Sequence, residues 1–463
     1  MANVRARQRL APSRTVDTRT AHGHRHRAAT GWFVWLVILA NAVMTIVLWA
    51  RGGNVSGVHS GAALLNSLGR ITGLLGTYLL LLQVLLLARF PWIERLTGFD
   101  RLTVWHRLNG KVCLYLILAH VALTTIGYAL TDRVSISREA SLLLQNYPGM
   151  VTAMIGTALL IVVVVTSLII VRRRLRYETW YLVHLTAYAA IYLSWTHQLP
   201  TGNEFLTNPA TATYWTTLYL ITLALLVIFR IVQPVYRGFW HRMHVEEVTV
   251  AGRNVVSLHI TGRHLDRLDA RAGQFFLWRF LTRGRWWESH PFSLSAAPDG
   301  RSLRITVKNS GDFTSRIGEI VPGTAVLAEG PFGVFTDDVR RRDRVALIAG
   351  GIGITPIRAL LEEMSCDLVL VYRVLREDDL VFRDELEELA WDRQMPLFYV
   401  VGDHAVPVGE RLMSPEHLGE LIPELAERDV YLCGPPVMTD ILEQNVLRAG
   451  VQRKHIHIER FAL

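Results

Sequence analysis

Cysteine is scarce in this 463-residue sequence, and its scarcity excludes two kinds of scaffold. The three cysteines are Cys113 in a long apolar run and Cys366 and Cys433 in the more polar second half. They offer neither the paired spacing of a disulfide framework nor that of a zinc site. No cysteine-based scaffold is therefore expected.

Charge is also in short supply, with 19% charged against 51% hydrophobic residues, and the shortage lies before residue 235. Six apolar runs there, each near the roughly 20 residues that a bilayer-crossing helix needs, cover residues 32–50, 64–88, 108–130, 150–171, 178–199 and 212–232. A cleaved signal peptide is the alternative for the first run, but this run is long and LWARGGN is a poor cleavage site. We therefore expect a basic tail at residues 1–31 and a six-helix transmembrane bundle at residues 32–235.

Positive charge is scarce in alternate loops. Residues 51–67, 131–149 and 200–211 hold few basic residues, whereas the tail and the loops after the second and fourth runs are rich in arginine. The positive-inside rule then places both termini in the cytoplasm. We expect an integral plasma membrane protein whose basic tail serves this topology and is attracted to anionic lipid, without a nucleic-acid partner.

Four histidines interrupt two of the apolar runs at matching positions. His106 and His184 lie near the cytoplasmic starts of the third and fifth runs, and His120 and His197 follow them by 14 and 13 residues. At about 1.5 Å per residue, both helices carry imidazoles at two depths about 20 Å apart. Because imidazole is an axial ligand of haem iron, the pairs His106 with His184 and His120 with His197 predict two stacked haems. The alternative is four histidines that bond across helices without a cofactor.

The two histidine spacings differ in one respect. At about 100° per residue, 14 steps return within about 40° of the starting face of a helix, whereas 13 steps miss that face by about 140°. Either the fifth run is distorted between its histidines, or the haems approach its helix from different sides.

Around these histidines the sequence resembles the ferric reductase and NADPH oxidase superfamily. The resemblance rests on LGRITGLLG, RFPWIERLTGFDRLTVWHRLNG, YETWYLVHL and the histidine spacings, and it covers most of residues 64–200. It implies two b-type haems held by the third and fifth helices. It also makes Arg70, near the outer end of the second helix, a candidate catalytic residue that holds a haem propionate or polarises the acceptor. The alternative is an arginine that extends to the membrane interface.

After residue 240 the pattern changes twice. Alternating apolar residues in HVEEVTVAGRNVVSLHITG, AGQFFLWRF and SLRITVKNSGDF predict short strands, so we expect an all-β barrel at residues 240–336. From DRVALIAGGIGITPIRALLEEM onward, apolar strands alternate with helices, which is typical of a parallel sheet. We expect an α/β nucleotide-binding domain at residues 340–463.

The turn after the first of these parallel strands is rich in glycine. Gly350, Gly351 and Gly353 permit a tight turn and a close approach of a pyrophosphate to the amides at a helix N-terminus. Pro356 suits the first turn of that helix, where a missing N–H costs nothing. The turn is not the GxGxxG fingerprint, so by itself it is a weak signal.

Five motifs occur in the order and spacing of the ferredoxin-NADP reductase family and strengthen this signal: HPFSLSAAP, KNSGDFTSRI, EGPFG, AGGIGITP and YLCGPP. By this resemblance the FAD-binding residues are His290, Pro291, Phe292, Ser293, Lys308, Gly311, Phe313, Thr314 and Gly330. The resemblance assigns to the nicotinamide nucleotide Gly350, Gly351, Gly353, Thr355, Pro356, Cys433, Gly434 and Pro435. Cys433 would border the nicotinamide itself and is also a candidate catalytic residue.

The sequence departs from this family at two places. The flavin motif begins with His290, where many soluble reductases have arginine. Relatives commonly end on an aromatic residue that stacks on the flavin, whereas this chain ends ERFAL. Phe461 is the candidate for that role, although two residues follow it.

The residues after the second parallel strand bear on the choice of nucleotide. An acidic residue there binds a ribose 2′-hydroxyl, whereas arginine accommodates a 2′-phosphate. VYRVLREDDL offers Arg373 and Arg376 before Glu377. This order favours NADPH, with NADH as the alternative.

Together these features predict an NAD(P)H-dependent flavohaem oxidoreductase. Electrons would pass from NADPH to FAD, then to the haem of His106 and His184, then to that of His120 and His197, and on to an extracytoplasmic acceptor. Dioxygen, with release of superoxide, is the expected acceptor. A ferric chelate is the first alternative, and a haem-binding donor to a partner protein is the second. The sequence indicates no oligomeric state.

Overall fold

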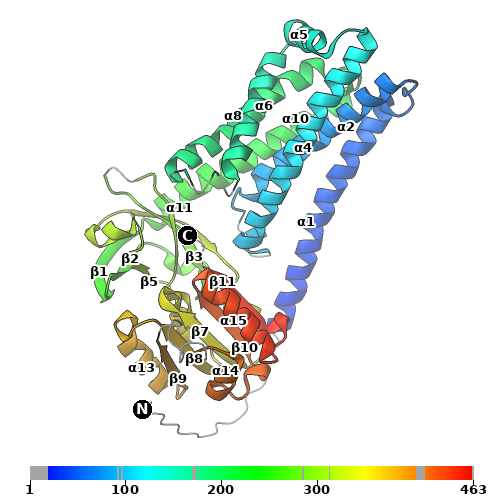
Figure 1. The fold of residues 1–463 in the computed structure, drawn as a ribbon. Coiled ribbons are helices and arrows are strands. Elements are labelled where there is room, and N and C mark those ends of the chain that lie inside the picture. Colours follow the sequence, from blue (N-terminus) through cyan, green and yellow to red (C-terminus); the bar gives the residue numbers. More distant parts are fainter. Residues whose placement is uncertain are drawn as a thin grey trace. The chain divides into compact units, whose positions relative to one another are not determined.

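In a computed structural model, the chain forms two compact units (Figure 1). The structure describes residues 19–460 except for 91–92, 95–96, 169–170, 172–173, 176, 284–285, 312 and 403–411. The helical unit comprises residues 28–90 and 99–231, and the second unit comprises residues 1–27, 91–98 and 232–463. The main boundary thus follows the change in hydrophobic pattern near residue 232.

The helical unit consists of long α-helices joined by short turns. Its helices are α1 (Arg19–Trp49), α2 (Gly61–Leu86), α4 (Phe99–Asp132), α5 (Ile136–Asn146), α6 (Met150–Ser167), α8 (Tyr177–Thr201), α9 (Asn203–Thr207) and α10 (Pro209–Val227), with π-helical turns η1 (Ala50–Asn54) and η2 (Ile228–Val232). Among the described residues, five helices are long and apolar enough to cross a membrane, at Trp32–Asn54, Gly61–Leu86, Arg101–Asp132, Met150–Ser167 and Pro209–His241. These overlap five of the six predicted runs. The remaining prediction, residues 178–199, falls on α8, which is not among the five.

Glycines allow neighbouring helices of this unit to pack closely. A Cβ on Gly69 of α2 would lie 2.6 Å from Cγ2 of Thr124 on α4. A Cβ on Gly156 of α6 would lie 2.8 Å from the carbonyl oxygen of Ala190 on α8. Small residues commonly bring membrane helices together in this way. As a result α2 lies along α4, and α6 lies along α8.

The first part of the second unit is rich in antiparallel strands. It comprises α11 (Gln233–His241), β1 (His244–Gly252), β2 (Val255–Thr261), β3 (Phe275–Phe280), β4 (His290–Ser293), β5 (Ser302–Lys308) and β6 (Val326–Phe332). Two three-stranded sheets, β1-β2-β5 and β4-β3-β6, share a core that includes Phe276, Trp278, Leu294 and Ile305. The prediction of β-sheet structure in this region is confirmed.

The remainder of this unit is a five-stranded parallel sheet with helices on both faces (Figure 1). Its strands are β7 (Arg344–Gly350), β8 (Asp367–Val374), β9 (Leu397–Val401), β10 (Asp429–Gly434) and β11 (Ile456–Arg460), and its helices are α12 (Ile354–Glu363), α13 (Arg383–Asp392), α14 (Pro415–Leu421) and α15 (Pro436–Arg448). The strand order is β11-β10-β7-β8-β9, and all neighbouring strands are parallel. Leu347 and Ile348 of β7 belong to separate buried clusters, as expected for a sheet covered on both faces. The predicted parallel sheet is confirmed.

Candidate functional site

In the helical unit, α4 and α8 bring the four histidines together in two pairs. The ring centres of His106 and His184 are 6.0 Å apart, and those of His120 and His197 are 6.5 Å apart. Between its two histidines α8 runs as a continuous α-helix. The 13-residue spacing therefore places His184 and His197 on faces of α8 about 140° apart.

Each pair has a geometry that fits an iron ion shared by two imidazoles. Bonds from a metal to an imidazole nitrogen are about 2 Å long, which places the centres of two opposing rings roughly 6 Å apart. Nδ1 of His106 lies 3.1 Å from the carbonyl oxygen of Gln83, and Nδ1 of His120 lies 2.8 Å from that of Gly69. Metal-binding histidines usually donate their second N–H to such a group. Nε2 of each ring on α4 is thus left for a metal, and the residues fit axial ligation of haem iron.

Polar residues around the inner pair were not found from the sequence. The Gln83 side chain donates to the carbonyl oxygen of His106 at 2.8 Å and accepts from Nδ2 of Asn109 at 2.8 Å. Nδ1 of His184 lies 3.2 Å from Oγ of Ser167 on α6. A signal was available, because a glutamine in an apolar run is costly to bury without a hydrogen-bond partner.

Arg70 lies beside the backbone carbonyl group that contacts His120 of the outer pair. It follows Gly69, whose carbonyl oxygen lies 2.8 Å from Nδ1 of His120. Its own guanidinium donates to Oδ1 of the buried Asn54 at 3.0 Å. A Cβ on Gly73, one turn further along α2, would lie 2.6 Å from Nδ1 of His120. This stretch of α2 therefore shapes the surroundings of His120.

In the second unit, the predicted flavin residues of β4 meet those of the turn before the 3₁₀-helix η4 (Thr314–Glu319). His290 stacks on Phe313 with ring centres 3.7 Å apart, and Phe292 lies 6.3 Å from Phe313. Oγ1 of Thr314 accepts from the amide of Gly311 at 2.9 Å, which closes the turn. Three aromatic rings from two segments thus gather at this point.

The other predicted flavin residues lie on the same two sheets. Ser293 is buried at the end of β4, and Pro291 in the middle of that strand is exposed. Lys308 ends β5. Gly330 of β6 accepts a hydrogen bond at its carbonyl oxygen from Arg237 of α11.

The glycine turn lies at the carboxyl edge of the parallel sheet, as the 3₁₀-turn η6 (Gly351–Gly353). Gly351 has a φ of +53°, and no atom lies within 4 Å of the position that its Cβ would take. A Cβ on Gly353 would instead clash with the carbonyl oxygen of Cys433, and one on Gly350 with Met438. The turn therefore packs against the end of β10 and stays open at Gly351. Ligands of open α/β sheets bind at this edge.

The neighbouring predicted residues complete this edge. Thr355 and Pro356 are buried in the first turn of α12, where Oγ1 of Thr355 donates to the carbonyl oxygen of Ile352 at 3.0 Å. Gly434 ends β10 and Pro435 precedes α15. The Cys433 thiol is fully buried, and burial raises its pKa well above the ordinary value.

The two arginines near the carboxyl end of β8, Arg373 and Arg376, differ in their surroundings. The Arg373 guanidinium is buried and donates to the carbonyl oxygens of Val374, Val400 and Gly402. The Arg376 side chain is 65% exposed, with Nε 3.7 Å from Asp379. Arg376 is thus the arginine of the two that reaches solvent. Phe461 lies outside the described residues.

An ionic network of two largely buried arginines and a partly exposed glutamate joins the antiparallel sheets to helices of the parallel sheet. Arg304 of β5 and Arg358 of α12 donate to Oε2 of Glu385 on α13 at 3.0 and 2.6 Å, and both donate to the carbonyl oxygen of Ser295. Burial alone would raise the pKa of Glu385, but the hydrogen bond from Arg304 and the charges of both arginines hold it below its ordinary value. We call Arg304, Arg358, Glu385 and Ser295 the ionic latch.

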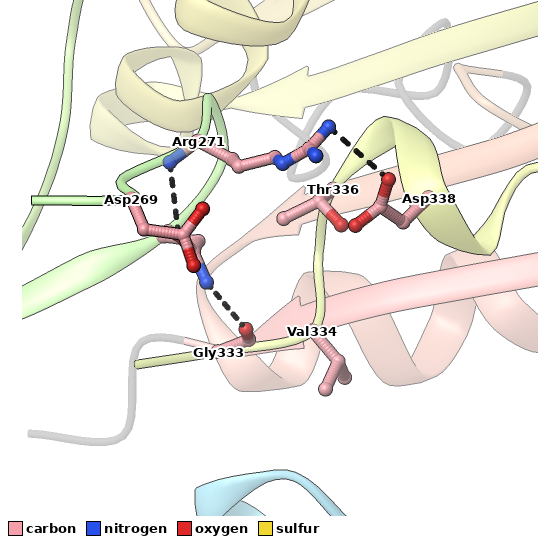
Figure 2. Close-up of a pocket in the computed structure, with 7 residues that line it drawn as sticks. Asp269, Arg271, Gly333, Val334, Thr336 and Asp338 are labelled. Carbon is pink, nitrogen blue, oxygen red and sulfur yellow. Dashed lines mark hydrogen bonds and ion pairs between the residues drawn. The ribbon is translucent and has the colours of Figure 1, made fainter. Parts of the chain in front are cut away.

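A polar pocket of about 160 Å³ lies between the turn before β3 and the segment after β6 (Figure 2). It is lined by Asp269, Arg271, Gln274, Gly333, Val334, Thr336 and Asp338. Arg271 forms an ion pair with Asp338 at 3.2 Å across it. None of the predicted cofactor residues lines the pocket, and it is smaller than the roughly 300 Å³ at which small-molecule sites begin.

Three known families match successive parts of the chain. Residues 72–195 match the family described as ferric reductase like transmembrane component. Residues 240–336 match the FAD-binding domain family, and residues 347–444 match the oxidoreductase NAD-binding domain family. The first match contains His106, His120 and His184 and ends two residues before His197, and the other two contain the five short motifs.

Curated relatives resemble part of the chain. Ferredoxin–NADP reductase B of Sorangium cellulosum is 29% identical over 187 residues, which are 37% of this chain and 77% of the relative. NADH-cytochrome b5 reductase 2 of Chaetomium globosum is 26% identical over 226 residues, which are 44% of this chain and 64% of the relative. The ferredoxin reductase component of the 3-ketosteroid-9-alpha-monooxygenase of Mycolicibacterium smegmatis is 31% identical over 47% of this chain and 63% of the relative.

Among solved structures, the FAD/NAD-binding domain of the nitric oxide dioxygenase from Vibrio cholerae is 24% identical, with a TM-score of 0.39 over 48% of this chain and 98% of that chain.

The family matches bear on the identity of the protein, because all three occur in one polypeptide. The chain has the ferric reductase and NADPH oxidase type of architecture, a ferric reductase-like transmembrane component followed by FAD-binding and NAD-binding domains, and is a membrane NAD(P)H-dependent flavin oxidoreductase.

Proposed function

We propose that this protein transfers electrons from cytoplasmic NADPH, through FAD and two b-type haems, to dioxygen on the extracytoplasmic side of the plasma membrane. The two facing histidine pairs, 6.0 and 6.5 Å apart, are the observation that carries the proposal. When bound, FAD would convert a hydride into single electrons, and the haems would supply one-electron carriers at two depths of the bilayer.

Within the membrane, His106 and His184 would hold the inner haem, and His120 and His197 the outer haem. The carbonyl oxygens of Gln83 and Gly69 keep a proton on Nδ1 of the two α4 rings, which leaves Nε2 free to ligate. Arg70 would hold a propionate of the outer haem or polarise the acceptor. Its position next to Gly69 supports this role.

In the second unit, the aromatic group of His290, Phe292 and Phe313 would line the flavin, with the remaining flavin residues around it. The open turn at Gly351 would receive the nicotinamide nucleotide. Arg376 would accept the 2′-phosphate of NADPH, because Arg373 is engaged by backbone carbonyls. Cys433 would border the nicotinamide, and Phe461 would stack on the flavin.

The proposal includes an architecture finer than the family matches. It comprises a cytoplasmic tail at residues 1–31, six crossings within residues 32–235, a closed β-barrel at residues 240–336 and the nucleotide-binding domain at residues 340–463, with both termini cytoplasmic. Contacts of α8 support its crossing, since Gln198 donates to Thr77 at 2.9 Å and accepts from Tyr219 at 3.0 Å. Isolated bridges between His244 and Ala325 and between Leu294 and Ile305 support closure of the barrel.

The test uses purified protein reconstituted with FAD and haem. NADPH oxidation is followed in air together with cytochrome c reduction, with and without superoxide dismutase, and the assay is repeated under argon with a ferric chelate. We expect dismutase-sensitive reduction in air and little anaerobic ferric reduction. Fast anaerobic ferric reduction would instead identify a ferric reductase. Absence of haem reduction in both assays would reject the electron path.

A further inference from the structure

Helix α11 packs against β6 of the antiparallel sheets. A Cβ on Gly238 would clash with the side chain of Leu327 on β6, so the helix backbone approaches the sheet closely. Beside it, the Arg237 guanidinium donates to the carbonyl oxygen of Gly330. These contacts fix which way α11 faces.

The opposite face of α11 is apolar and uncovered. Val235, Tyr236 and Phe239 are 49%, 59% and 73% exposed. Their spacing of three and four residues places them on one stripe of the helix. Tyr236 stacks on Trp240 with ring centres 5.8 Å apart, and Trp240 stacks on His264 at 4.9 Å. The stripe is therefore a fixed surface that water alone would solvate poorly.

The chain itself indicates what covers this stripe. Only η2 separates α11 from α10, and the apolar span that includes α10 continues to His241. At about 1.5 Å per residue, the five residues of η2 extend roughly 8 Å, so α11 begins close to the membrane surface. Tyrosine and tryptophan are enriched at that level. Arg230 and Arg242, on either side of the stripe, suit the negative headgroups of anionic phospholipids.

We infer that α11 lies in the headgroup layer of the bilayer, with Val235, Tyr236 and Phe239 directed toward the acyl chains. Amphipathic helices bind in this way, with the apolar face about 5–10 Å below the headgroups. The occupant of the stripe is anionic phospholipid. The helix would then anchor the flavin-binding part of the chain at the membrane surface. This inference requires only that α10 crosses the membrane, and it is independent of the haems and of the acceptor.

The test is photo-crosslinking of the full chain in nanodiscs of phosphatidylcholine and phosphatidylglycerol. Phe239→p-benzoylphenylalanine places a photoreactive ring at the most exposed position of the stripe, and Trp391→p-benzoylphenylalanine provides a control on α13 at a side chain that is 83% exposed. We expect mass spectrometry to detect phospholipid adducts at residue 239 several-fold more often than at residue 391. Adducts of residue 239 to another part of the chain or to a second copy would overturn the inference, as would equal lipid labelling at both positions.

Hydrogen exchange provides a second readout that does not require the photoreactive variants to fold. Amides of residues 233–241 should exchange several-fold more slowly in nanodiscs that contain phosphatidylglycerol than in nanodiscs of phosphatidylcholine alone. Phe239→Ser should remove this difference, whereas Trp391→Ser should leave it. Exchange of α11 that is the same in both lipids would contradict the assignment. Neither readout depends on turnover, so a failure here is distinguishable from failure of the proposed electron path.

Discussion

At the residue scale, Gly73 controls the space beside the outer histidine pair. A Cβ there would lie 2.6 Å from Nδ1 of His120, so Gly73→Ala must displace the ring or the helix. We expect G73A to lose the outer haem, which lowers the haem content per chain by about half in a pyridine haemochrome assay. Gly61→Ala is the control. Gly61 lies on the same helix, and no atom lies within 4 Å of the position that its Cβ would take. Equal haem content in both variants would refute the role of Gly73.

The ionic latch gives a second prediction at this scale. The Arg358 side chain is 8% exposed, and its removal leaves Glu385 without its shortest hydrogen bond. Breaking a buried pair costs about 3–5 kcal/mol, but Glu385 is 38% exposed, so solvent screening reduces the expected loss for Arg358→Ala to roughly 2 kcal/mol.

The measurement is the temperature at which FAD fluorescence is released on heating. Arg383→Ala is the matched control: Arg358 pairs with Glu362 and Glu385, and Arg383 likewise pairs with Glu377 and Glu387 but is 48% exposed. Its removal should cost about 0.5 kcal/mol or less. Similar shifts in the two variants would show that the latch adds nothing to the stability of this unit.

The pKa of Glu385 adds a pH dependence with a definite sign. Its pKa is lower in the folded than in the unfolded chain, so its contribution to stability is complete above the unfolded value of about 4.3 and is lost as pH falls through the folded value. The difference in FAD-release temperature between the wild type and Glu385→Gln should therefore be largest near neutral pH and shrink below about pH 4.3. A difference that persists unchanged in acid would argue against an ionised Glu385 as the cause.

Residue type and spacing were sufficient to predict the histidine pairs, because an imidazole in an apolar run is unusual and the spacings match. They were insufficient for Gly73 or the ionic latch. Arg304 and Glu385 are 81 residues apart in the chain, and no periodic pattern relates them. Contacts between distant elements depend on packing, which composition does not express.

At the scale of elements, α8 shows that the hydropathy averaged over a whole helix can differ from the polarity of the face that contacts lipid. This helix was predicted as a span, yet it is not among the five described helices that are apolar enough to cross. Its polar side chains have partners on neighbouring helices, as Gln198 does with Thr77 of α2 and Tyr219 of α10. Polar groups that are paired inside a bundle reduce the mean hydropathy without contacting lipid.

We therefore predict that α8 crosses the membrane, so that the loop after it lies on the same side as the loop after α4. Single cysteines at Thr207 and Ser135, in a chain with its native cysteines replaced, should both react with a membrane-impermeant maleimide in intact cells. A cysteine at Arg174, before α8, should not react. Protection of residue 207 together with labelling of residue 135 would mean that α8 does not cross.

At the scale of the whole molecule, three matched regions place a ferric reductase-like transmembrane component before an FAD-binding and an NAD-binding domain. The order of these regions along the chain was predictable, since each has its own hydrophobic pattern. The electron acceptor was not, because reduction at a haem edge requires no particular set of side chains. Function at this scale must be tested through the order in which electrons reach the two histidine pairs.

The two histidine pairs predict such an order. His120→Ala should leave the inner pair intact, so the remaining haem should still be reduced by NADPH while reduction of the external acceptor falls to background. His106→Ala should leave a haem that dithionite reduces but NADPH does not, because the inner site no longer lies between it and the flavin. Both variants should retain NADPH-dependent reduction of ferricyanide at the flavin, which serves as the control for folding of the second unit. Reduction of the remaining haem by NADPH in His106→Ala would show that the proposed order of the two sites is wrong.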